Sequence, residues 1–299
     1  MSKIIFKGIM PALVTPMDAN EKLIRPVVGE LMDYQLARGV DGFYVGGATG
    51  EGPIIPVSTR MELCEAAIEA NRGRGKIIVH VGGPNFTDVQ ALAKHATECG
   101  ADGISAMAPN AYFGHSDREL IDYYKRIASL TDKPLLVYVT PLMLGNNLSS
   151  VFTELMEVEN IAGLKFTQYN YYLMTLLKMI NGGDINIING PDEMLLCGLS
   201  MGADGGIGST YNVMPERYAA LYKAFREGDI DRAREIQYSV NRVIRVILEF
   251  GSGAVLANVK DAVRLMGFNV GECAYPMACA DAAGLAEMKR RLIEAGLEL

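Results

Sequence analysis

The sequence predicts an α/β protein, a (β/α)8 TIM barrel with a C-terminal helical extension. Short β-rich runs alternate with amphipathic stretches of about 10 to 16 residues, the pattern of βα units around a parallel sheet. Eight such runs can be counted, and eight units favour a closed barrel over an open sheet. A chain of 299 residues is long enough for one barrel, which commonly needs roughly 250 residues.

The strands are expected at residues 8–16, 41–47, 76–83, 102–109, 133–141, 161–167, 185–190 and 204–210. Helical patterns lie between them, for example at 58–73 and 116–130. Thr59 stands three positions before Glu62, and Ser116 three positions before Glu119. Both spacings predict a capping box at a helix start.

A short sequence motif that occurs three times supports the count of eight units. The segments "RGVDG" at 38–42, "CGADG" at 99–103 and "MGADG" at 201–205 each contain glycine, a small residue, aspartate and glycine. Each is typical of a helix that ends at glycine and leads directly into a strand. The second motif begins 61 residues after the first, and the third begins 102 residues after the second. These offsets correspond to two and four units of roughly 25 to 30 residues, in register with an eight-unit repeat.

The C-terminal part of the chain has a different pattern. From about residue 229 it shows helical patterns at 231–250, 252–267 and 281–296 and no good strand. No linker separates this part from the strands before it. We therefore expect residues 1–228 to form the barrel and residues 229–299 to form a helical extension packed on it, within the same domain.

Composition excludes several classes of function. The sequence is 49% hydrophobic and 21% charged with a net charge of -7, so a nucleic-acid partner is not expected. No apolar stretch approaches the roughly 20 residues that span a bilayer, and the N-terminus does not resemble a secretory signal. Five cysteines without a CxxC pair and three histidines without HExxH spacing indicate reduced thiols in a cytoplasm and no metal site. A small-molecule ligand fits best.

A lysine stands in the middle of the expected strand "IAGLKFT". Side chains alternate along a strand, so Leu164 and Phe166, with Ala162, should face the surrounding helices while Lys165 points into the barrel. The same alternation places Tyr138 inside from the preceding strand. The two residues are one βα unit apart and should project from neighbouring strands, whose spacing is about 4.8 Å.

This pair can carry chemistry. Burial disfavours the charged form of an amine, so an enclosed lysine becomes a nucleophile that can form a Schiff base with a keto group. A neighbouring phenol can carry protons to and from the reacting atoms. The alternatives are a Lys165 ammonium paired with a carboxylate inside the barrel and a Tyr138 that only fills the core. The two residues together on adjacent strands favour catalysis.

The loop after the second strand, "GGATGEGP" at 46–53, is rich in glycine. Its backbone N–H groups and the Thr49 hydroxyl make a suitable cradle for a small anion such as a carboxylate. It matches neither GxxxxGK[ST] nor GxGxxG, and glycine turns after strands are often purely structural.

With these residues assembled, the chain resembles the family of class I, Schiff-base aldolases that contains N-acetylneuraminate lyase and dihydrodipicolinate synthase. The likeness covers nearly the whole chain. "YVGGATGE" at 44–51 is similar to the family's pyruvate-carboxylate loop, which implies a substrate-binding role for Ala48 and Thr49. "VYVTP" at 137–141 and "GLKFT" at 163–167 are similar to the motifs that carry its catalytic tyrosine and its Schiff-base lysine. The resemblance thus implies that Tyr138 and Lys165 are catalytic.

Within the family, "NGPDE" at 189–193 and "GADGGIGSTYN" at 202–212 look most like the sialic-acid lyase branch. That likeness implies that Asp192, Glu193 and Ser209, with the Gly190 backbone, hold a polyhydroxy tail, and that Thr167 lies close to the reacting carbons. Ionised carboxylates suit vicinal hydroxyls because they only accept hydrogen bonds. Aspartate and glutamate are also favoured at a helix N-terminus, which is the alternative reading.

Several positions depart from the family pattern. Ala48 stands where a hydroxyl residue usually precedes the loop threonine, and Pro191 stands where lyases often carry tyrosine. Val139 and Thr140 replace the more familiar Asn-Ile. The segment "APNAYFGHS" at 108–116 is one residue longer than usual, and Tyr112 is the candidate there for the family's second tyrosine.

The resemblance predicts a homotetrameric enzyme that cleaves N-acetylneuraminate to pyruvate and N-acetylmannosamine and needs neither a metal nor an organic cofactor. The alternatives are an aldolase for another hydroxylated 2-keto acid, a dihydrodipicolinate synthase-like condensation of pyruvate with an aldehyde, and a barrel that only binds a keto acid. The synthase branch uses an arginine shortly after the tyrosine motif, and "TPLMLGNNLS" contains none.

Overall fold

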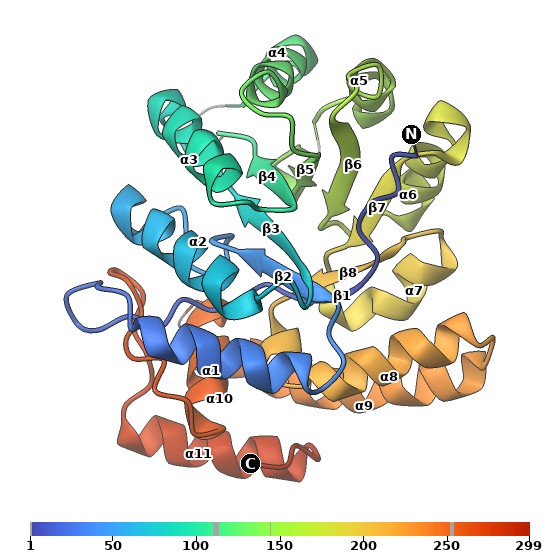
Figure 1. Ribbon diagram of the computed structural model, residues 1–299. Coiled ribbons are helices and arrows are strands. Elements are labelled where there is room, and N and C mark those ends of the chain that lie inside the picture. The colour runs from blue at the N-terminus through green and yellow to red at the C-terminus, as the bar shows by residue number, and fades with distance from the viewer. Residues whose placement is uncertain (1, 110–113, 144, 252–253) are drawn as a thin grey trace.

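The computed structural model describes residues 2–109, 114–143, 145–251 and 254–299, which form a closed barrel of eight parallel strands (Figure 1). The strands are β1 (Gly8–Pro11), β2 (Gly42–Val45), β3 (Lys76–His80), β4 (Gly103–Met107), β5 (Leu135–Val139), β6 (Ile161–Phe166), β7 (Asn186–Asn189) and β8 (Gly205–Gly208). β8 pairs with β1, and a parallel bridge between Ala12 and Tyr44 joins β1 to β2. The predicted fold class is confirmed.

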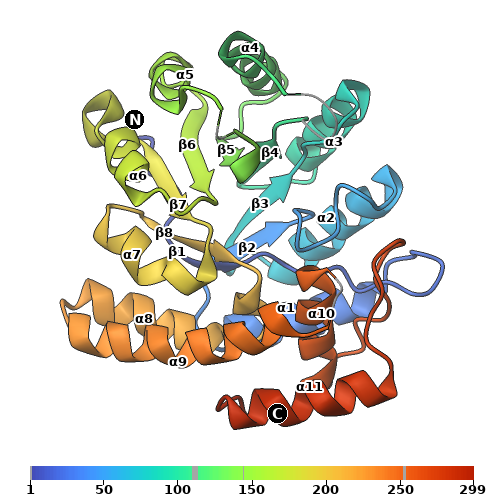
Figure 2. The same cartoon turned by 180° about the vertical axis from the view of Figure 1, so that it is seen from behind.

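Helices surround the strands in the order that the alternation predicted. The barrel helices are α1 (Arg25–Leu36), α2 (Val57–Asn71), α3 (Phe86–Glu98), α4 (Asp117–Ala128), α5 (Leu148–Leu155), α6 (Tyr171–Lys178), α7 (Leu195–Ser200) and α8 (Pro215–Arg226). The C-terminal helices are α9 (Ile230–Glu249), α10 (Val255–Leu265) and α11 (Ala282–Glu294). Both views show α9 lying along α8 (Figure 2). In the described part of the chain, no helix is both long and apolar enough to cross a membrane.

The core has two layers, as a barrel requires. One cluster fills the space between strands and helices and includes Leu135, Val137, Leu164 and Phe166. A smaller cluster fills the barrel interior. Its members are Phe6, Met10, Ala12, Tyr44, Ile78, Leu136, Tyr138, Ala162, Ile188 and Ile207. Side-chain alternation therefore assigned most of β5 and β6 to the correct face.

Ala162 is the exception. We expected it to face the helices, but it lies in the interior cluster with Leu136. The reason is a register shift: Leu135 pairs with Ile161, and the next residue, Leu136, pairs with Gly163. The irregularity inserts one extra residue in β6 and breaks the two-residue period. From Gly163 onward the period resumes, so Lys165 still points inward.

The helix boundaries confirm one predicted capping box and correct the other. Ser116 and Glu119 form both hydrogen bonds of the box at the start of α4. α2, however, begins at Val57, and its N-cap is Pro56. The Pro56 carbonyl accepts from the Arg60 amide at 3.1 Å, so the helical hydrogen bonds begin before Ser58. Thr59 lies inside the first turn, where its hydroxyl donates to the Glu21 carbonyl.

The first glycine of each of the three repeated motifs ends a helix, as expected. Gly39, Gly100 and Gly202 have φ values of 87°, 88° and 98°. These left-handed angles suit glycine, which has no Cβ to clash with the backbone. Each turn leads within three residues into β2, β4 or β8.

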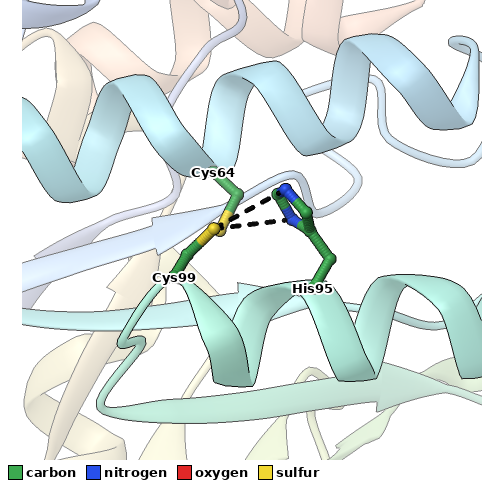
Figure 3. Close-up of side chains that lie close together, drawn as sticks. All are labelled: Cys64, His95 and Cys99. Carbon is green, nitrogen blue, oxygen red and sulfur yellow. Dashed lines mark hydrogen bonds between the residues drawn. The ribbon is translucent and has the colours of Figure 1, made fainter.

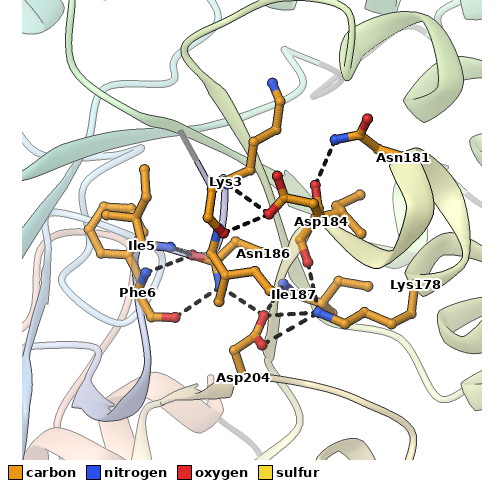
Figure 4. A network of polar contacts seen from close by, with 12 residues as sticks. Lys3, Ile5, Phe6, Lys178, Asn181, Asp184, Asn186, Ile187 and Asp204 are labelled. Atoms are coloured by element: carbon orange, nitrogen blue, oxygen red, sulfur yellow. Dashed lines mark hydrogen bonds and ion pairs between the residues drawn. The ribbon is translucent and has the colours of Figure 1, made fainter.

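The N-terminal segment packs beside the start of β7, where Asn186 lies (Figure 4). Asn186 of β7 accepts from the Phe6 amide at 2.7 Å and donates to the Phe6 carbonyl at 2.9 Å. Its side chain also donates to Asp204, which pairs with Lys178 at 3.3 Å. These bonds satisfy buried polar groups and place the Phe6 ring against the interior cluster.

Candidate active site

Lys165 and Tyr138 are direct partners in the pairing of β5 with β6. Only 5% of Lys165 is exposed, and its Nζ lies 4.0 Å from the centre of the Tyr138 ring. A second tyrosine, Tyr44 of β2, has its ring centre 4.8 Å from the same nitrogen. Within the described residues, no carboxylate lies within 4.0 Å of Lys165 Nζ. The amine therefore lies against two aromatic rings. The alternative, a Lys165 ammonium paired with a carboxylate inside the barrel, does not apply to the described residues.

Polar side chains lie next to these tyrosines. The Tyr44 hydroxyl donates to Ser105 Oγ at 3.0 Å, and burial raises the pKa of Tyr44 well above its usual range. His80 is also buried, and its pKa is lowered by burial and then by the charges of Arg60 and Lys165. Its Nε2 can accordingly accept the Met107 amide at 3.1 Å as a neutral imidazole. The protonated phenol and the neutral imidazole add no charge of their own, and the buried cation beside them is Arg60, which donates to the His80 carbonyl at 2.8 Å.

The glycine-rich loop after β2 folds back on itself. Glu51 N–H donates to the Ala48 carbonyl at 2.9 Å, and Gly52 N–H donates to the Gly47 carbonyl at 3.0 Å. A Cβ at Gly47 would overlap the Tyr44 ring, so this close approach requires glycine. Among the described residues, the amides of Ala48 and Thr49 have no hydrogen-bond acceptor. These two donors are available to an anion.

A buried ion pair connects this loop to helix α10. Glu51 is 2% exposed and has a left-handed φ of 60°. Its carboxylate accepts from Lys260 Nζ of α10 at 2.9 Å and from the Ala274 amide at 2.6 Å. Lys260 also donates to the Glu272 carbonyl. The C-terminal extension thus fixes the conformation of the loop that carries Thr49.

The remaining predicted residues meet at one cavity of about 250 Å³ next to the end of β6. Five of the residues that the sequence singled out line it: Thr167, Gly190, Asp192, Glu193 and Ser209. Thr167 is two residues beyond Lys165 and follows the end of β6, whereas Lys165 and Tyr138 themselves are not among the residues that line the cavity. Gly190 packs directly against the Thr167 side chain, where a Cβ would overlap the hydroxyl.

Asp192 is the buried carboxylate of this cavity. Its Oδ2 accepts from the Thr210 amide at 2.7 Å, from the Thr210 hydroxyl at 2.6 Å and from Ser209 Oγ at 3.4 Å. Burial raises its pKa to about 6, although Thr210 and, more weakly, Lys165 act in the opposite direction. One carboxylate oxygen is thus used by the protein.

Glu193 is more exposed and accepts a hydrogen bond from the Tyr169 hydroxyl. That bond, together with burial, raises the pKa of Tyr169 to about 12. Helix α9 supports the segment from outside, because Gln237 donates to the Asp192 carbonyl and Asn241 to the Glu193 carbonyl. The short helix that begins at Asp192 is therefore tied to the C-terminal extension.

The sequence analysis missed several residues of this region. They are Tyr44, Ser105, Tyr169, Thr210, Lys260 and the apolar cavity residues Ile244, Leu248 and Val255. Strand alternation applied to β2 would have placed Tyr44 inside. No local pattern marks the α9 and α10 residues, because they reach the cavity only through tertiary packing. Tyr112 lies outside the described residues.

A cysteine and histidine cluster lies between α2 and α3 (Figure 3). The ligand atoms of Cys64, His95 and Cys99 lie within 4.8 Å of one another. His95 Nε2 also lies 3.0 Å from a Glu65 oxygen, so the ring already has a polar partner. This is the one group of three metal-ligand side chains found among the described residues, and it lies outside the candidate site.

Comparison with known proteins shows the family. A model of the dihydrodipicolinate synthetase family matches residues 5–295. An N-acetylneuraminate lyase of Escherichia coli is 35% identical over 286 residues, covering 95% of either chain. The structure of Proteus mirabilis N-acetylneuraminate lyase superposes with a TM-score of 0.91 at 28% identity, covering 98% of this chain and 99% of that one.

A prophage protein of the dihydrodipicolinic acid synthase family from Escherichia coli K12, solved in complex with pyruvate, also superposes with a TM-score of 0.91. It is 26% identical and covers 98% of this chain and all of its own. The family model and the sequence identity, each spanning nearly the full length, lead to one conclusion. The chain belongs to the dihydrodipicolinate synthetase family.

Proposed function

We propose that the protein is a class I lyase that cleaves N-acetylneuraminate to pyruvate and N-acetylmannosamine. The observation that carries this proposal is the Lys165 amine, buried against two tyrosine rings and paired in register with Tyr138. The 35% identity to an N-acetylneuraminate lyase supports the choice of substrate.

The proposed reaction begins at the keto carbon of the open-chain substrate. The Lys165 amine attacks C2, and loss of water from the carbinolamine gives an iminium. Tyr138 gives its phenol proton to the departing hydroxyl of the carbinolamine, and the resulting phenolate takes the proton of the C4 hydroxyl. The C3–C4 bond then breaks, and its electron pair moves into the iminium to form an enamine. The aldehyde leaves, C3 is protonated, and water hydrolyses the new iminium to release pyruvate and the free amine. The iminium itself is the electron sink.

The loop at residues 46–51 is the proposed site for the substrate carboxylate. Two free amides, those of Ala48 and Thr49, and the Thr49 hydroxyl offer three donors to an anion. Alanine at position 48 has no side-chain hydroxyl to offer, but it keeps the backbone donor.

The cavity beside β6 is the proposed site for the hydroxylated tail. Asp192, Glu193 and Ser209 line it and carry oxygen atoms in their side chains, and Thr167 and Gly190 also line it. Sugar hydroxyls can donate to the carboxylates and accept from the serine. One wall is apolar, formed by Ile244 and Leu248 of α9, and suits the methyl group of an acetamido substituent.

Borohydride trapping tests the mechanism. Incubation with pyruvate and sodium borohydride is expected to fix one pyruvyl adduct on the peptide that contains Lys165, and Lys165→Arg should give none. Lys178→Arg is a matched control, because Lys178 is a half-buried lysine paired with Asp204 outside the site. An adduct on another lysine, or none, would refute the mechanism.

The nearest rival is an aldolase for another hydroxylated 2-keto acid, and Pro191 in the tail segment favours it because lyases often carry tyrosine there. A second rival is a synthase-like condensation, kept open by the pyruvate-bound structural relative. Cleavage rates with N-acetylneuraminate and with shorter sugar acids, and aldol rates of pyruvate with several aldehydes, separate these reactions. Preference for a shorter acid would refute our choice of substrate.

We also propose a homotetramer in the cytoplasm, in keeping with the family resemblance. Three large apolar side chains near α6 are well exposed in the single chain: Tyr169 at 67%, Tyr172 at 73% and Met179 at 73%. Exposed apolar groups of this kind are typical of protein contacts. Light scattering on the purified protein measures the assembly, and a monomer at micromolar concentration would contradict it.

A further inference from the structure

Two cysteines lie unusually close together in the segment between α10 and α11. Cys273 Sγ and Cys279 Sγ are 3.1 Å apart, and both residues are half-buried. A disulfide bond is about 2.05 Å long, so an approach of about 1 Å would join them. A turn in which Met277 N–H donates to the Ala274 carbonyl at 3.0 Å brings the two ends together.

The backbone next to each cysteine is held in place. Ala274, which follows Cys273, donates its amide to Glu51 at 2.6 Å. Ala280, which follows Cys279, donates its amide to Asp261 at 2.7 Å. Both acceptors are buried carboxylates. The two thiols are therefore positioned toward one another by contacts that do not depend on the sulfur atoms.

The environment favours ionisation of one thiol of the pair. A hydrogen bond from Cys273 lowers the pKa of Cys279 below its ordinary value, against burial and the nearby Asp261. The same bond, together with burial, raises the pKa of Cys273. A thiolate is the reactive form of cysteine. Because the two sulfur atoms are in direct contact, a thiolate on one cysteine has the other beside it as the resolving thiol.

We propose that Cys273 and Cys279 form a reversible redox-modification site, oxidised to a disulfide by a peroxide. The thiolate of one cysteine attacks one peroxide oxygen and breaks the O–O bond, which gives a sulfenic acid and, after protonation, water. The thiol of the other cysteine then attacks the sulfenic sulfur and releases a second water. In sum, two thiols are oxidised to one disulfide and hydrogen peroxide is reduced to two waters. A dithiol reductant reverses the change by thiol–disulfide exchange.

The site is coupled to the active-site loop. Glu272 and Ala274, the two neighbours of Cys273, contact Lys260 and Glu51. That ion pair supports residues 46–51, the loop after β2. Joining Cys273 to Cys279 restricts the segment that supplies these contacts, so oxidation is expected to reduce local opening of the loop as well.

Thiol titration tests the oxidation step. One equivalent of hydrogen peroxide is expected to lower the thiols titrated in denaturant from five to three, and dithiothreitol to restore five. Cys197→Ser, which removes an exposed cysteine, should fall from four to two. The double variant Cys273→Ser/Cys279→Ser should remain at three.

Differential alkylation then locates the disulfide. The tryptic peptide 265–289 contains Cys273 and Cys279 and no other cysteine. After free thiols are blocked and the disulfide is reduced, the second label should appear twice on this peptide. Cys64 and Cys99 are the competing close pair. Labelling of that pair instead, a disulfide-linked dimer, or no loss of thiols would overturn the proposal.

Hydrogen exchange tests the coupling. Peptides covering 42–55 and 265–280 are expected to exchange several-fold more slowly after oxidation, with reversal by dithiothreitol and no response in the double serine variant. An unchanged rate in 42–55, with the disulfide formed, would overturn the link to the loop. None of these measurements depends on which keto acid the enzyme cleaves.

Discussion

Lys260→Met is the substitution whose effect the structure defines most sharply. Lys260 is 1% exposed and Glu51 is 2% exposed, and Nζ lies 2.9 Å from Oε1. Methionine retains the apolar stem but leaves the Glu51 carboxylate buried, with the Ala274 amide as its remaining described partner. Removing one partner of a buried pair costs about 3–5 kcal/mol, because the other charge is left uncompensated. We expect a loss of that size in the free energy of unfolding.

Urea denaturation followed by circular dichroism measures this loss. The double variant Glu51→Gln/Lys260→Met should recover at least about 1 kcal/mol relative to the sum of the single variants, because residues in contact are not additive. Lys125→Met is the matched control, since Lys125 pairs with Glu154 in a half-exposed setting where ion pairs are worth about 0–1 kcal/mol. The KM for the keto acid should rise in Lys260→Met, because the loop at 46–51 loses its support. A loss below about 1 kcal/mol, or strict additivity, would refute the reasoning.

Three further outcomes are expected. Tyr138→Phe should lower kcat by about 10²–10⁴-fold while leaving the borohydride adduct with pyruvate intact, because only the proton carrier is lost; a wild-type kcat would contradict this. The pKa of Asp192 is raised to about 6, so kcat/KM for the sugar acid should fall as the pH drops through about 6, and Asp192→Asn should flatten that limb of the profile. The pKa of Asp192 in the folded protein exceeds the ordinary 3.8 of an unfolded chain, so protonation of Asp192 stabilises the fold. This contribution to the free energy of unfolding is complete below pH 3.8 and is lost as the pH rises through about 6. Deleting residues 229–299 should abolish cooperative unfolding of the barrel, since α9 covers α8 and supports Asp192; a cooperative transition in the truncated chain would show that the barrel folds alone.

The repeated βα pattern made the fold predictable. Eight strand runs, the echoed glycines and the change of pattern at about residue 229 are local features, and local features decide which segments become strands and helices. Alternation also assigned Lys165 and Tyr138 to the interior, because both lie on stretches of regular pairing. It failed at Ala162, where an extra residue in β6 shifts the register, and a shift of that kind depends on the neighbouring strand.

The candidate site also contains residues that local motifs reveal and residues that only tertiary packing brings together. Lys165, Tyr138 and the glycine-rich loop lie in short motifs that the sequence displays directly, so the sequence by itself determined the barrel, the reacting pair and the resemblance to an aldolase family. The second tyrosine ring over the amine, the Glu51–Lys260 ion pair and the apolar wall from α9 join residues up to 209 positions apart. The ion pair and the apolar wall form only when the C-terminal helices pack on the barrel, and the tyrosine contact forms only when the barrel brings β2 and β6 together. Tertiary structure alone therefore decided how the loop is held and how much of Asp192 remains free for a ligand, because burial and long-range partners determine both.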